Sequence, residues 1–272
     1  MSIIQFMQQE QEQKTGMIWD YVSPSRLSLW LKCPLAFRKR YIDGEQTSPT
    51  PALFVGKIVH AVLAHVYRQR IAGQLCTTDD LSMLVADAWQ FATETEPCYF
   101  DDDTQEEKCR YQVLDLVKTY MHSTPIQDEV PLAIEKRYEV PLIDPMTGED
   151  FGIPLVGVVD LVLKEECGNV IVDLKTSATS TLCELQHEVQ LTSYAYCFRE
   201  TTGHDELGCE VRQLVKTKTP KILTHRFHTR SEEHFSRFFG LIREYLDALD
   251  SGIYNYRPGW ACGMCDHCGS CC

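Results

Sequence analysis

Two aspartates near the middle of the chain lie among apolar, strand-forming residues. Asp160 lies within residues 157–163 and Asp173 within residues 170–176, and a short turn separates the two segments. Burying a carboxylate in such a strand is costly unless it is paired or binds a cation. Two of them on adjacent strands repel each other unless a divalent metal lies between them. The pattern predicts a metal site, although such a pair in isolation could also face solvent.

Lys175 extends this pattern, because it lies two residues after Asp173 and strand alternation places both side chains on one face. An ammonium group beside metal-bound carboxylates suits phosphodiester cleavage. The metal polarises the phosphate and acidifies a water molecule, while the lysine positions that water or neutralises developing charge. The alternative is that Lys175 is a surface partner of the aspartate.

Three further features could belong to the same site. His60 lies on an apolar helix expected over residues 53–70, where a neutral imidazole could be a third metal ligand or an ordinary core histidine. Gln190 and Tyr194 are four residues apart and share a helical face, so they could contact a phosphate, a base or the lysine, or be a polar surface pair. Glu135, in an earlier strand, could supply an additional or outer carboxylate, or lie on the surface.

The thirteen cysteines are distributed unevenly along the chain. Most are scattered singly and are predicted to be small buried side chains. Five crowd the last eleven positions: Cys262, Cys265, Cys268, Cys271 and Cys272. Several thiolates in one short loop can hold a soft metal centre. The tail alone fits zinc, with His267 as a further candidate ligand, as well as it fits an iron–sulfur cluster.

Hydrophobic periodicity predicts the elements that must position these residues. Helices are expected over 26–41 (interrupted at Pro34), 53–70, 81–93 and 111–121, then strands over 132–142, 155–164 and 169–175, a helix over 181–198, strands over 211–216 and 222–227, and a helix over 231–249. This order predicts a mixed α/β core. Residues 1–22 are expected to be a polar, flexible leader. Residues 23–272 form one domain, with a mainly helical portion (23–130), an α/β core (131–250) and a cysteine-rich tail (251–272).

Composition limits how the protein could meet nucleic acid. The formal net charge is −13, from 39 acidic and 26 basic residues, which argues against binding by bulk charge but allows a locally basic groove. The basic clusters are Arg38, Lys39 and Arg40, near Trp30, Phe37 and Tyr41, and Lys216, Lys218 and Lys221. No apolar run is long enough to cross a membrane, and the start lacks the apolar region of a secretory signal. We therefore expect a cytoplasmic protein.

Taken in order, these motifs resemble those of RecB-like PD-(D/E)XK nucleases: a helical G-x-x-x-H, a Glu-bearing strand, G-x-V-D, D-x-K and then Q-x-x-x-Y. The chain is similar to the CRISPR adaptation exonucleases of the fourth Cas family and to the nuclease domains of RecB and AddB. The likeness spans Ser23 to the C-terminus. Each motif alone is weak, but five in the right order are specific. The resemblance implies a restriction-endonuclease-like core, a mixed central sheet flanked by helices.

The resemblance also implies roles for particular residues. His60, Asp160, Asp173 and the Leu174 carbonyl would bind Mg²⁺ or Mn²⁺. Lys175 would be the catalytic lysine, acting with the two aspartates, and Gln190 and Tyr194 would assist. The second acidic position holds Asp where some relatives have Glu, which is a permitted variant.

Cys33 lies in Leu-Lys-Cys-Pro-Leu-Ala-Phe, which resembles the C-P-x-x-F element of iron–sulfur nucleases in this family. Those relatives use one early cysteine and three late ones, commonly spaced C-x2-C-x5-C. That spacing selects Cys33, Cys262, Cys265 and Cys271 for a [4Fe–4S] cluster, with Cys268 or Cys272 as replacements for Cys271. Such a cluster would close a loop of almost the whole chain and restrict the unfolded state.

The expected activity is that of a metal-dependent deoxyribonuclease, an exonuclease acting on single-stranded ends without sequence specificity. One alternative is a DNA-processing subunit that acts only within a larger complex, for example with an integrase or helicase. Another is a non-enzymatic zinc protein. The sequence leaves the pathway open between CRISPR adaptation, recombination repair and phage DNA processing.

Overall fold

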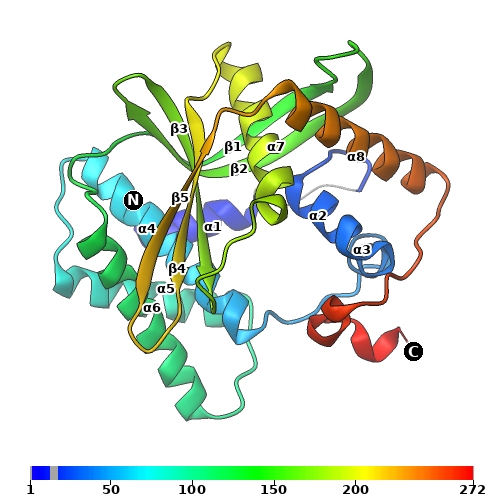
Figure 1. Ribbon diagram of the computed structural model, residues 1–272. Helices are drawn as coiled ribbons and strands as arrows, with labels where there is room; N and C mark the ends of the chain where they lie inside the picture. Colours follow the sequence, from blue (N-terminus) through cyan, green and yellow to red (C-terminus); the bar gives the residue numbers. More distant parts are fainter. Residues whose placement is uncertain (1, 13–17, 272) are drawn as a thin grey trace.

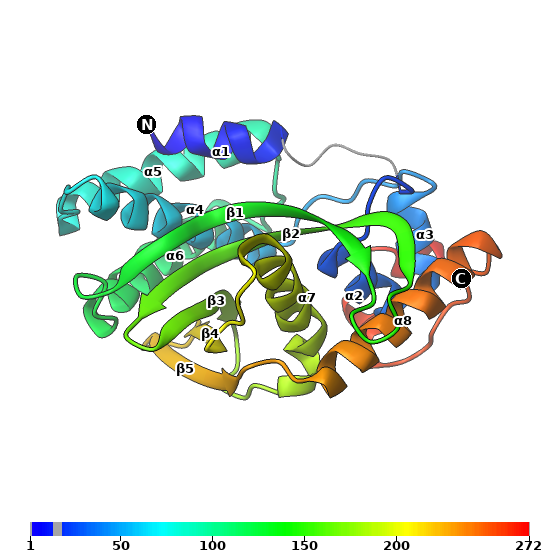
Figure 2. The same cartoon turned by 90° about the horizontal axis from the view of Figure 1, so that it is seen from above.

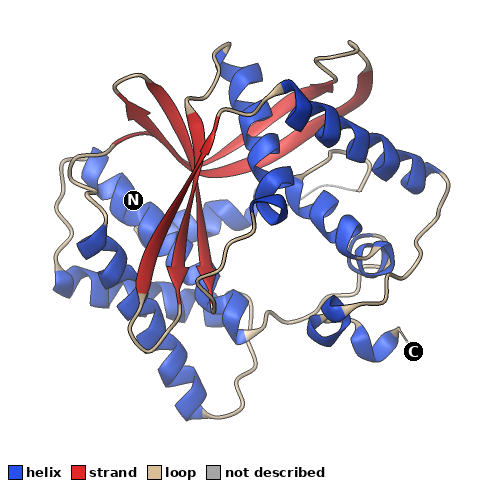
Figure 3. Cartoon of the chain, viewed as in Figure 1, coloured by secondary structure: helices blue, strands red, loops and turns tan. Residues whose placement is uncertain are grey.

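The computed structural model describes residues 2–12 and 18–271 and confirms the predicted mixed α/β class (Figure 3). The described elements, in chain order, are α1 (Ile3–Glu12), α2 (Pro24–Lys32), α3 (Pro34–Tyr41), α4 (Pro51–Ile71), α5 (Thr78–Thr95), α6 (Asp103–Ser123), β1 (Val130–Ile143), β2 (Asp150–Glu165), β3 (Gly168–Ser177), α7 (Glu184–Thr202), β4 (Gly208–Val215), β5 (Lys221–His228), α8 (Glu232–Asp250) and two short 3₁₀ helices, η1 (Trp260–Met264) and η2 (Cys268–Ser270). No described helix combines the length and apolarity that crossing a membrane requires.

Hydroxyl caps and prolines determine where the early helices begin. The Ser23 hydroxyl accepts the Arg26 N–H at 3.3 Å before α2, and the Thr50 hydroxyl accepts the Leu53 N–H at 3.4 Å before α4. A proline follows each cap, where its missing N–H costs nothing. Between α2 and α3, Cys33 is extended (φ −163°), which separates the two helices and leaves its thiol at their junction.

The five strands form one sheet in the order β1-β2-β3-β4-β5 (Figure 1). Neighbouring strands are antiparallel except for β3 and β4, which are parallel. A parallel pair requires a crossover connection, and α7 provides it. The β1–β2 pair is much longer than the rest and curves away from the other strands, as the view from above shows (Figure 2).

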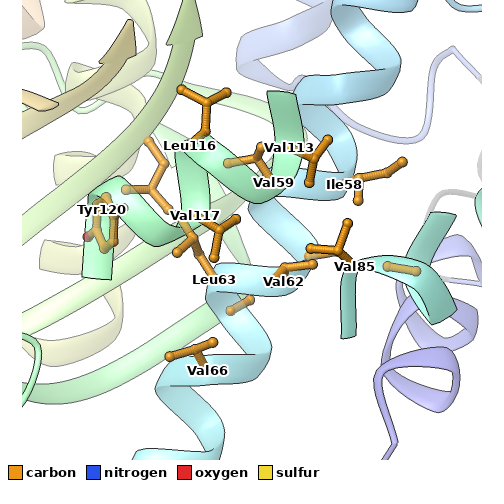
Figure 4. Close-up of a cluster of buried hydrophobic side chains, with 14 of the residues drawn as sticks. Ile58, Val59, Val62, Leu63, Val66, Val85, Val113, Leu116, Val117 and Tyr120 are labelled. Carbon is orange, nitrogen blue, oxygen red and sulfur yellow. The ribbon is translucent and has the colours of Figure 1, made fainter. Parts of the chain in front are cut away.

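Helices pack on both sides of the sheet and bury two hydrophobic cores (Figures 1 and 2). The first core lies under α1, α4, α5 and α6, and Figure 4 shows its centre, with α4 residues such as Val62 and Leu63 and α6 residues such as Leu116 and Val117. The second lies under α2, α3, α7 and α8. Leu161 belongs to the first core and Val159 to the second. Asp160 therefore lies where β2 passes from one core to the other.

The expectation of a flexible polar leader over residues 1–22 was wrong for the part that the structure describes. Residues Ile3–Glu12 form α1, and Ile3, Phe6 and Met7 are buried in the first core. The Arg68 guanidinium lies 3.8 Å from the centre of the Phe6 ring. The apolar residues have the i, i+3, i+4 spacing of a helix that packs on one face, but a glutamine-rich background obscured it. Residues 13–17 of the expected leader lie outside the described residues.

Candidate metal and catalytic site

Three potential metal ligands from three elements converge between α4 and the sheet. The His60 Nδ1 atom of α4 lies 3.6 Å from Asp160 Oδ1 of β2 and 3.9 Å from Glu135 Oε1 of β1. Within residues 2–12 and 18–271, this is the group whose ligand atoms all lie within 4.8 Å of one another. One imidazole and two carboxylates are a donor set that suits a divalent cation.

The β1–β2 register explains why Glu135 belongs to this group. Ile134 pairs with Leu161 and Lys136 pairs with Val159, so Glu135 lies opposite Asp160. Side chains directly opposite each other on paired strands are neighbours. Glu135 also has φ +44°, the one positive φ among the described residues other than glycine. Such a backbone conformation costs about 1–3 kcal/mol and tends to occur at functional sites.

Asp173 and Lys175 form a second pair beside this group. Lys175 Nζ donates to Asp173 Oδ1 at 2.7 Å, as strand alternation predicted for their shared face. The Asp173 side chain is fully buried, and its Oδ2 atom has no hydrogen-bond partner in the described part of the chain. A buried carboxylate oxygen without a partner is unfavourable unless a cation contacts it.

The geometry between β2 and β3 holds Asp160 in place. The ladder between these strands extends as far as the Leu161–Val172 pair, and beyond it the Asp160 Oδ2 atom accepts the Leu174 N–H at 2.7 Å. The Asp160 side chain thus accepts the Leu174 N–H of β3, which has no partner in the β2 backbone because the two strands diverge here. For Leu174, the structure defines this N–H contact, and the proposed metal contact of its carbonyl stays a prediction.

The surroundings of the two aspartates shift their pKa values in opposite directions. Burial raises the pKa of Asp173 to about 6, with Lys175 opposing the rise. Burial also acts on Asp160, but His60, Lys175 and the Leu174 N–H together hold its pKa below the usual value. Burial lowers the pKa of Lys175, and the carboxylates of Asp173 and Asp160 outweigh it, so the net pKa is raised and the ammonium form is favoured. The site therefore holds a fixed positive charge beside a cluster of carboxylates.

Gly56 allows α4 to approach β3 closely enough to bring His60 into the site. A Cβ atom added at Gly56 would lie 2.9 Å from Thr176 Oγ1, closer than real side chains pack. His60 is four residues further along the same helical face. The G-x-x-x-H spacing thus combines a close backbone contact with a ligand one turn later.

These residues line an open pocket of ≈ 550 Å³. Its walls come from α1, α4, β1, β2, β3 and the end of β4, and they consist of Met7, Ala52, Leu53, Gly56, Lys57, His60, Ala61, Glu135, Val158, Asp160, Lys175, Thr176 and Lys216. The polar composition of the first residues gave no indication that Met7 lines this pocket. The pocket presents acidic ligands at one wall and three lysines around them.

Gln190 and Tyr194 lie in a neighbouring pocket. Gln190 Nε2 donates to the Tyr194 hydroxyl at 2.6 Å, as expected for two residues one helical turn apart. Burial raises the pKa of Tyr194 well above its usual value, and the nearby Asp160 and Asp173 carboxylates add to that rise. Both side chains line a second pocket of ≈ 620 Å³, which shares Val158 with the first.

The early and late cysteines come together although they are far apart in sequence. A third pocket, of ≈ 240 Å³, is lined by Cys33 of the α2–α3 junction and by Cys262, Cys265, Cys268 and Cys271 of the tail. Buried His267 lines the same pocket, and its Nδ1 lies 3.2 Å from Glu45 Oε2. None of the described cysteines forms a disulfide, and Cys272 lies outside the described residues.

The prediction that the scattered cysteines are small buried side chains was only partly right. Cys197 and Cys209 are buried, and Cys76, Cys98 and Cys109 are half-buried. Cys167 and Cys183 are exposed, because one lies in the β2–β3 turn and the other immediately precedes α7.

The family comparison agrees with this geometry. A family profile described as the PD-(D/E)XK nuclease superfamily matches residues 21–272. The chain belongs to this superfamily. Its members are phosphodiesterases that use divalent metals, and the His60–Glu135–Asp160 group supplies a candidate site for one.

Solved structures extend the comparison to the fold. A crystal structure of a protein provisionally described as an exonuclease from Eubacterium rectale has a TM-score of 0.58 with this chain at 15% sequence identity, covering 92% of this chain and 88% of that one. The crystal structure of SSO0001 gives a TM-score of 0.47 at 12% identity, with 99% of this chain and 93% of that one covered. None of the curated proteins compared with the chain matches it.

Proposed function

We propose that this protein is a deoxyribonuclease that requires Mg²⁺ or Mn²⁺ and degrades single-stranded DNA from its ends. The observation that carries the proposal is the His60–Glu135–Asp160 group, which lines one open pocket together with Lys175, the partner of the buried Asp173. Carboxylates, an imidazole and an ammonium group at one point are what hydrolysis of a phosphodiester needs. The superfamily assignment supports the same chemistry.

Each polar group of the site has a distinct task in this proposal. His60, Asp160 and Glu135 would hold the divalent ion, and Asp173 would join them through its unpartnered Oδ2 atom. When bound, the ion would polarise the phosphate and acidify a water molecule. Lys175, fixed by Asp173 at 2.7 Å, would orient that water and neutralise charge that develops on the phosphate. Gln190 and Tyr194 would assist from the neighbouring pocket.

The cysteine pocket supports the further proposal of a [4Fe–4S] cluster held by Cys33, Cys262, Cys265 and Cys271. Four thiolates facing one pocket are the donor set of such a cluster. The C-P-x-x-F element at Cys33 and the C-x2-C-x5-C spacing of the tail support this cluster over a single zinc ion. Cys268 lines the same pocket and is the alternative to Cys271.

End-labelled single-stranded DNA tests the activity. Anaerobically purified protein would be incubated with Mn²⁺, Mg²⁺ or chelator, beside Lys175→Ala and a matched Lys164→Ala control that removes an exposed lysine at the end of β2. We expect metal-dependent shortening that Lys175→Ala abolishes and Lys164→Ala retains. Circular single strands should resist. Equal cutting of circular and linear DNA would refute the requirement for ends.

The metal content tests the cluster. We expect iron and acid-labile sulfide in the wild-type protein and their loss in Cys33→Ser, while Cys167→Ser, an exposed cysteine in the β2–β3 turn, keeps both. Zinc without iron would refute the cluster. A protein with intact iron that cuts no DNA would instead indicate that the nuclease acts only within a larger assembly, such as one with an integrase or helicase.

A further inference from the structure

We propose that the second pocket binds the stretch of single-stranded DNA next to the scissile phosphate, with Arg40 and Arg137 contacting two of its phosphates. This inference rests on the proposed nuclease function and adds a defined path for the strand. Neither arginine belongs to the metal and catalytic group. The second pocket, of ≈ 620 Å³, is lined by Tyr21, Ser23, Pro24, Ser25, Arg26, Ser28, Arg40, Tyr41, Arg137, Val156, Val158, Gln190 and Tyr194.

The two pockets are neighbours along β2. Val158 lines both of them, Asp160 lines the first and Val156 lines the second. Val158 is 40% exposed and is the residue that both the pocket of the acidic ligands and the pocket of the two arginines share. A strand whose reacting phosphate lies at Asp160 would pass over Val158 and enter the second pocket.

Strand pairing places Arg137 beside Val158. It lies directly opposite Val158 in the β1–β2 ladder, two residues after Glu135. Its Nη1 atom donates to Glu139 Oε2 at 2.5 Å, and the Glu139 side chain is 52% exposed. An ion pair this open to water contributes little, about 0–1 kcal/mol, so a phosphate can compete for the guanidinium. Guanidinium groups bind phosphates through paired hydrogen bonds.

Arg40 faces the same pocket from the opposite wall. It is one of three consecutive basic residues at the end of α3, and the other two are engaged: Arg38 pairs with Asp43 and Lys39 with Glu45. Among the described residues, no carboxylate lies within 4.0 Å of the Arg40 guanidinium. Its exposed guanidinium is therefore the charge of that cluster most available to a phosphate.

Aromatic side chains complete a surface suited to unpaired bases. Tyr21 and Tyr41, both half-buried, line the pocket, and the Arg26 guanidinium lies 3.7 Å from the centre of the Tyr21 ring. Single-strand sites combine cations that follow the backbone with aromatic rings on which bases stack. The chain as a whole is acidic, with a net charge of −13, so a local group of arginines is where a polyanion can approach it.

Binding measured without cleavage tests this site. A fluorescein-labelled oligothymidylate would be titrated by anisotropy in chelator with wild-type protein, with the double variant Arg40→Ala/Arg137→Ala, and with Lys108→Ala/Arg110→Ala. The control pair removes the same charge from exposed positions on α6. We expect the first double variant to bind at least tenfold more weakly and the control within twofold of wild type.

The salt dependence separates phosphate contact from a general structural effect. Losing two phosphate contacts should reduce the slope of log affinity against log salt by about 1.4, at roughly 0.7 per contact for single strands. Arg40→Lys/Arg137→Lys should restore that slope, because the charges remain. Circular dichroism should show the same melting for all variants.

The outcomes distinguish this site from the nuclease itself. Wild-type protein that binds the strand but never cuts it would contradict a nuclease that acts alone. A loss of affinity in Arg40→Ala/Arg137→Ala would still support the site in that case. Cleavage by wild type together with equal affinities and slopes for both double variants would overturn the site alone. Absence of strand binding by wild-type protein would overturn it as well.

Discussion

Replacing Gly56 with alanine tests whether the approach of α4 to β3 sets the metal site. The added Cβ would lie 2.9 Å from Thr176 Oγ1, whereas ordinary contact begins at 3.4 Å, so the helix and the strand must separate by about 0.5 Å. Thr176 cannot easily rotate away, because β-branched side chains are stiff at χ1. His60 moves with the helix, away from Asp160 at 3.6 Å and Glu135 at 3.9 Å.

We expect Gly56→Ala to lose metal binding and activity while it loses little stability. Overpacking costs about 1–3 kcal/mol, and exchanging glycine for alanine within a helix returns about 1 kcal/mol. Functional sites need positions held to about 0.5 Å, and misplacement by about 1 Å can cost 100-fold in rate. We therefore expect Gly56→Ala to weaken Mn²⁺ binding and to slow cleavage about 10- to 100-fold, with a melting temperature within a few degrees of wild type.

A double variant determines whether the clash is the cause. Thr176→Ala removes Oγ1, so Gly56→Ala/Thr176→Ala should recover Mn²⁺ affinity, measured by calorimetry, and cleavage, measured on end-labelled DNA. Thr176→Val keeps an atom in place of Oγ1 and should not rescue. Wild-type metal affinity in Gly56→Ala, or equal rescue by alanine and valine, would refute the argument that this contact positions His60.

Three further substitutions probe the site and its support. Glu135→Gln should weaken Mn²⁺ binding by about tenfold or more, measured by calorimetry, because it removes a charge from the ligand group; unchanged affinity would exclude Glu135 as a ligand. Arg212→Leu should lower the free energy of unfolding in urea by about 3–5 kcal/mol, because the buried Glu210 and the half-buried Glu129 lose their partner. Phe6→Ala should cost about 3 kcal/mol if α1 is part of the core; a change below 0.5 kcal/mol would show that α1 contributes little.

Local patterns were enough to predict the strands that carry the candidate site. Asp173 and Lys175 were predicted to share a face because alternation along one strand needs no knowledge of the rest of the fold, and the structure joins them by a hydrogen bond. The helix and strand order followed in the same way from periodicity. The position of Glu135 did not, because it depends on the β1–β2 register and on a positive φ, neither of which the neighbouring residues specify.

The sequence did not predict other features of the site, because packing between distant segments determines which residues are buried. Met7 lines the metal pocket from α1, which a polar composition made look like a leader. Gln190 and Tyr194 were correctly placed on one helical face, but only the packing of α7 against β2 shows that they face the second pocket. A Cβ at Gly157 of β2 would lie 3.5 Å from the Tyr194 ring, which shows how close that packing is.

The α2–α3 segment connects the cysteine pocket to the proposed DNA path. Arg40 lines both the second pocket and the pocket of the five cysteines, and Cys33 lies at the start of the helix that carries it. The Arg257 guanidinium of the tail also contacts the Leu31 carbonyl of α2, so the tail and this segment are packed together. A group that ties Cys33 to the tail would therefore fix the helix whose last turn presents Arg40 to the strand. The cysteines would then influence cleavage by positioning Arg40, which contacts the DNA strand, although they lie far from Lys175. We therefore expect Cys33→Ser to reduce the affinity for single-stranded DNA more than the affinity for Mn²⁺.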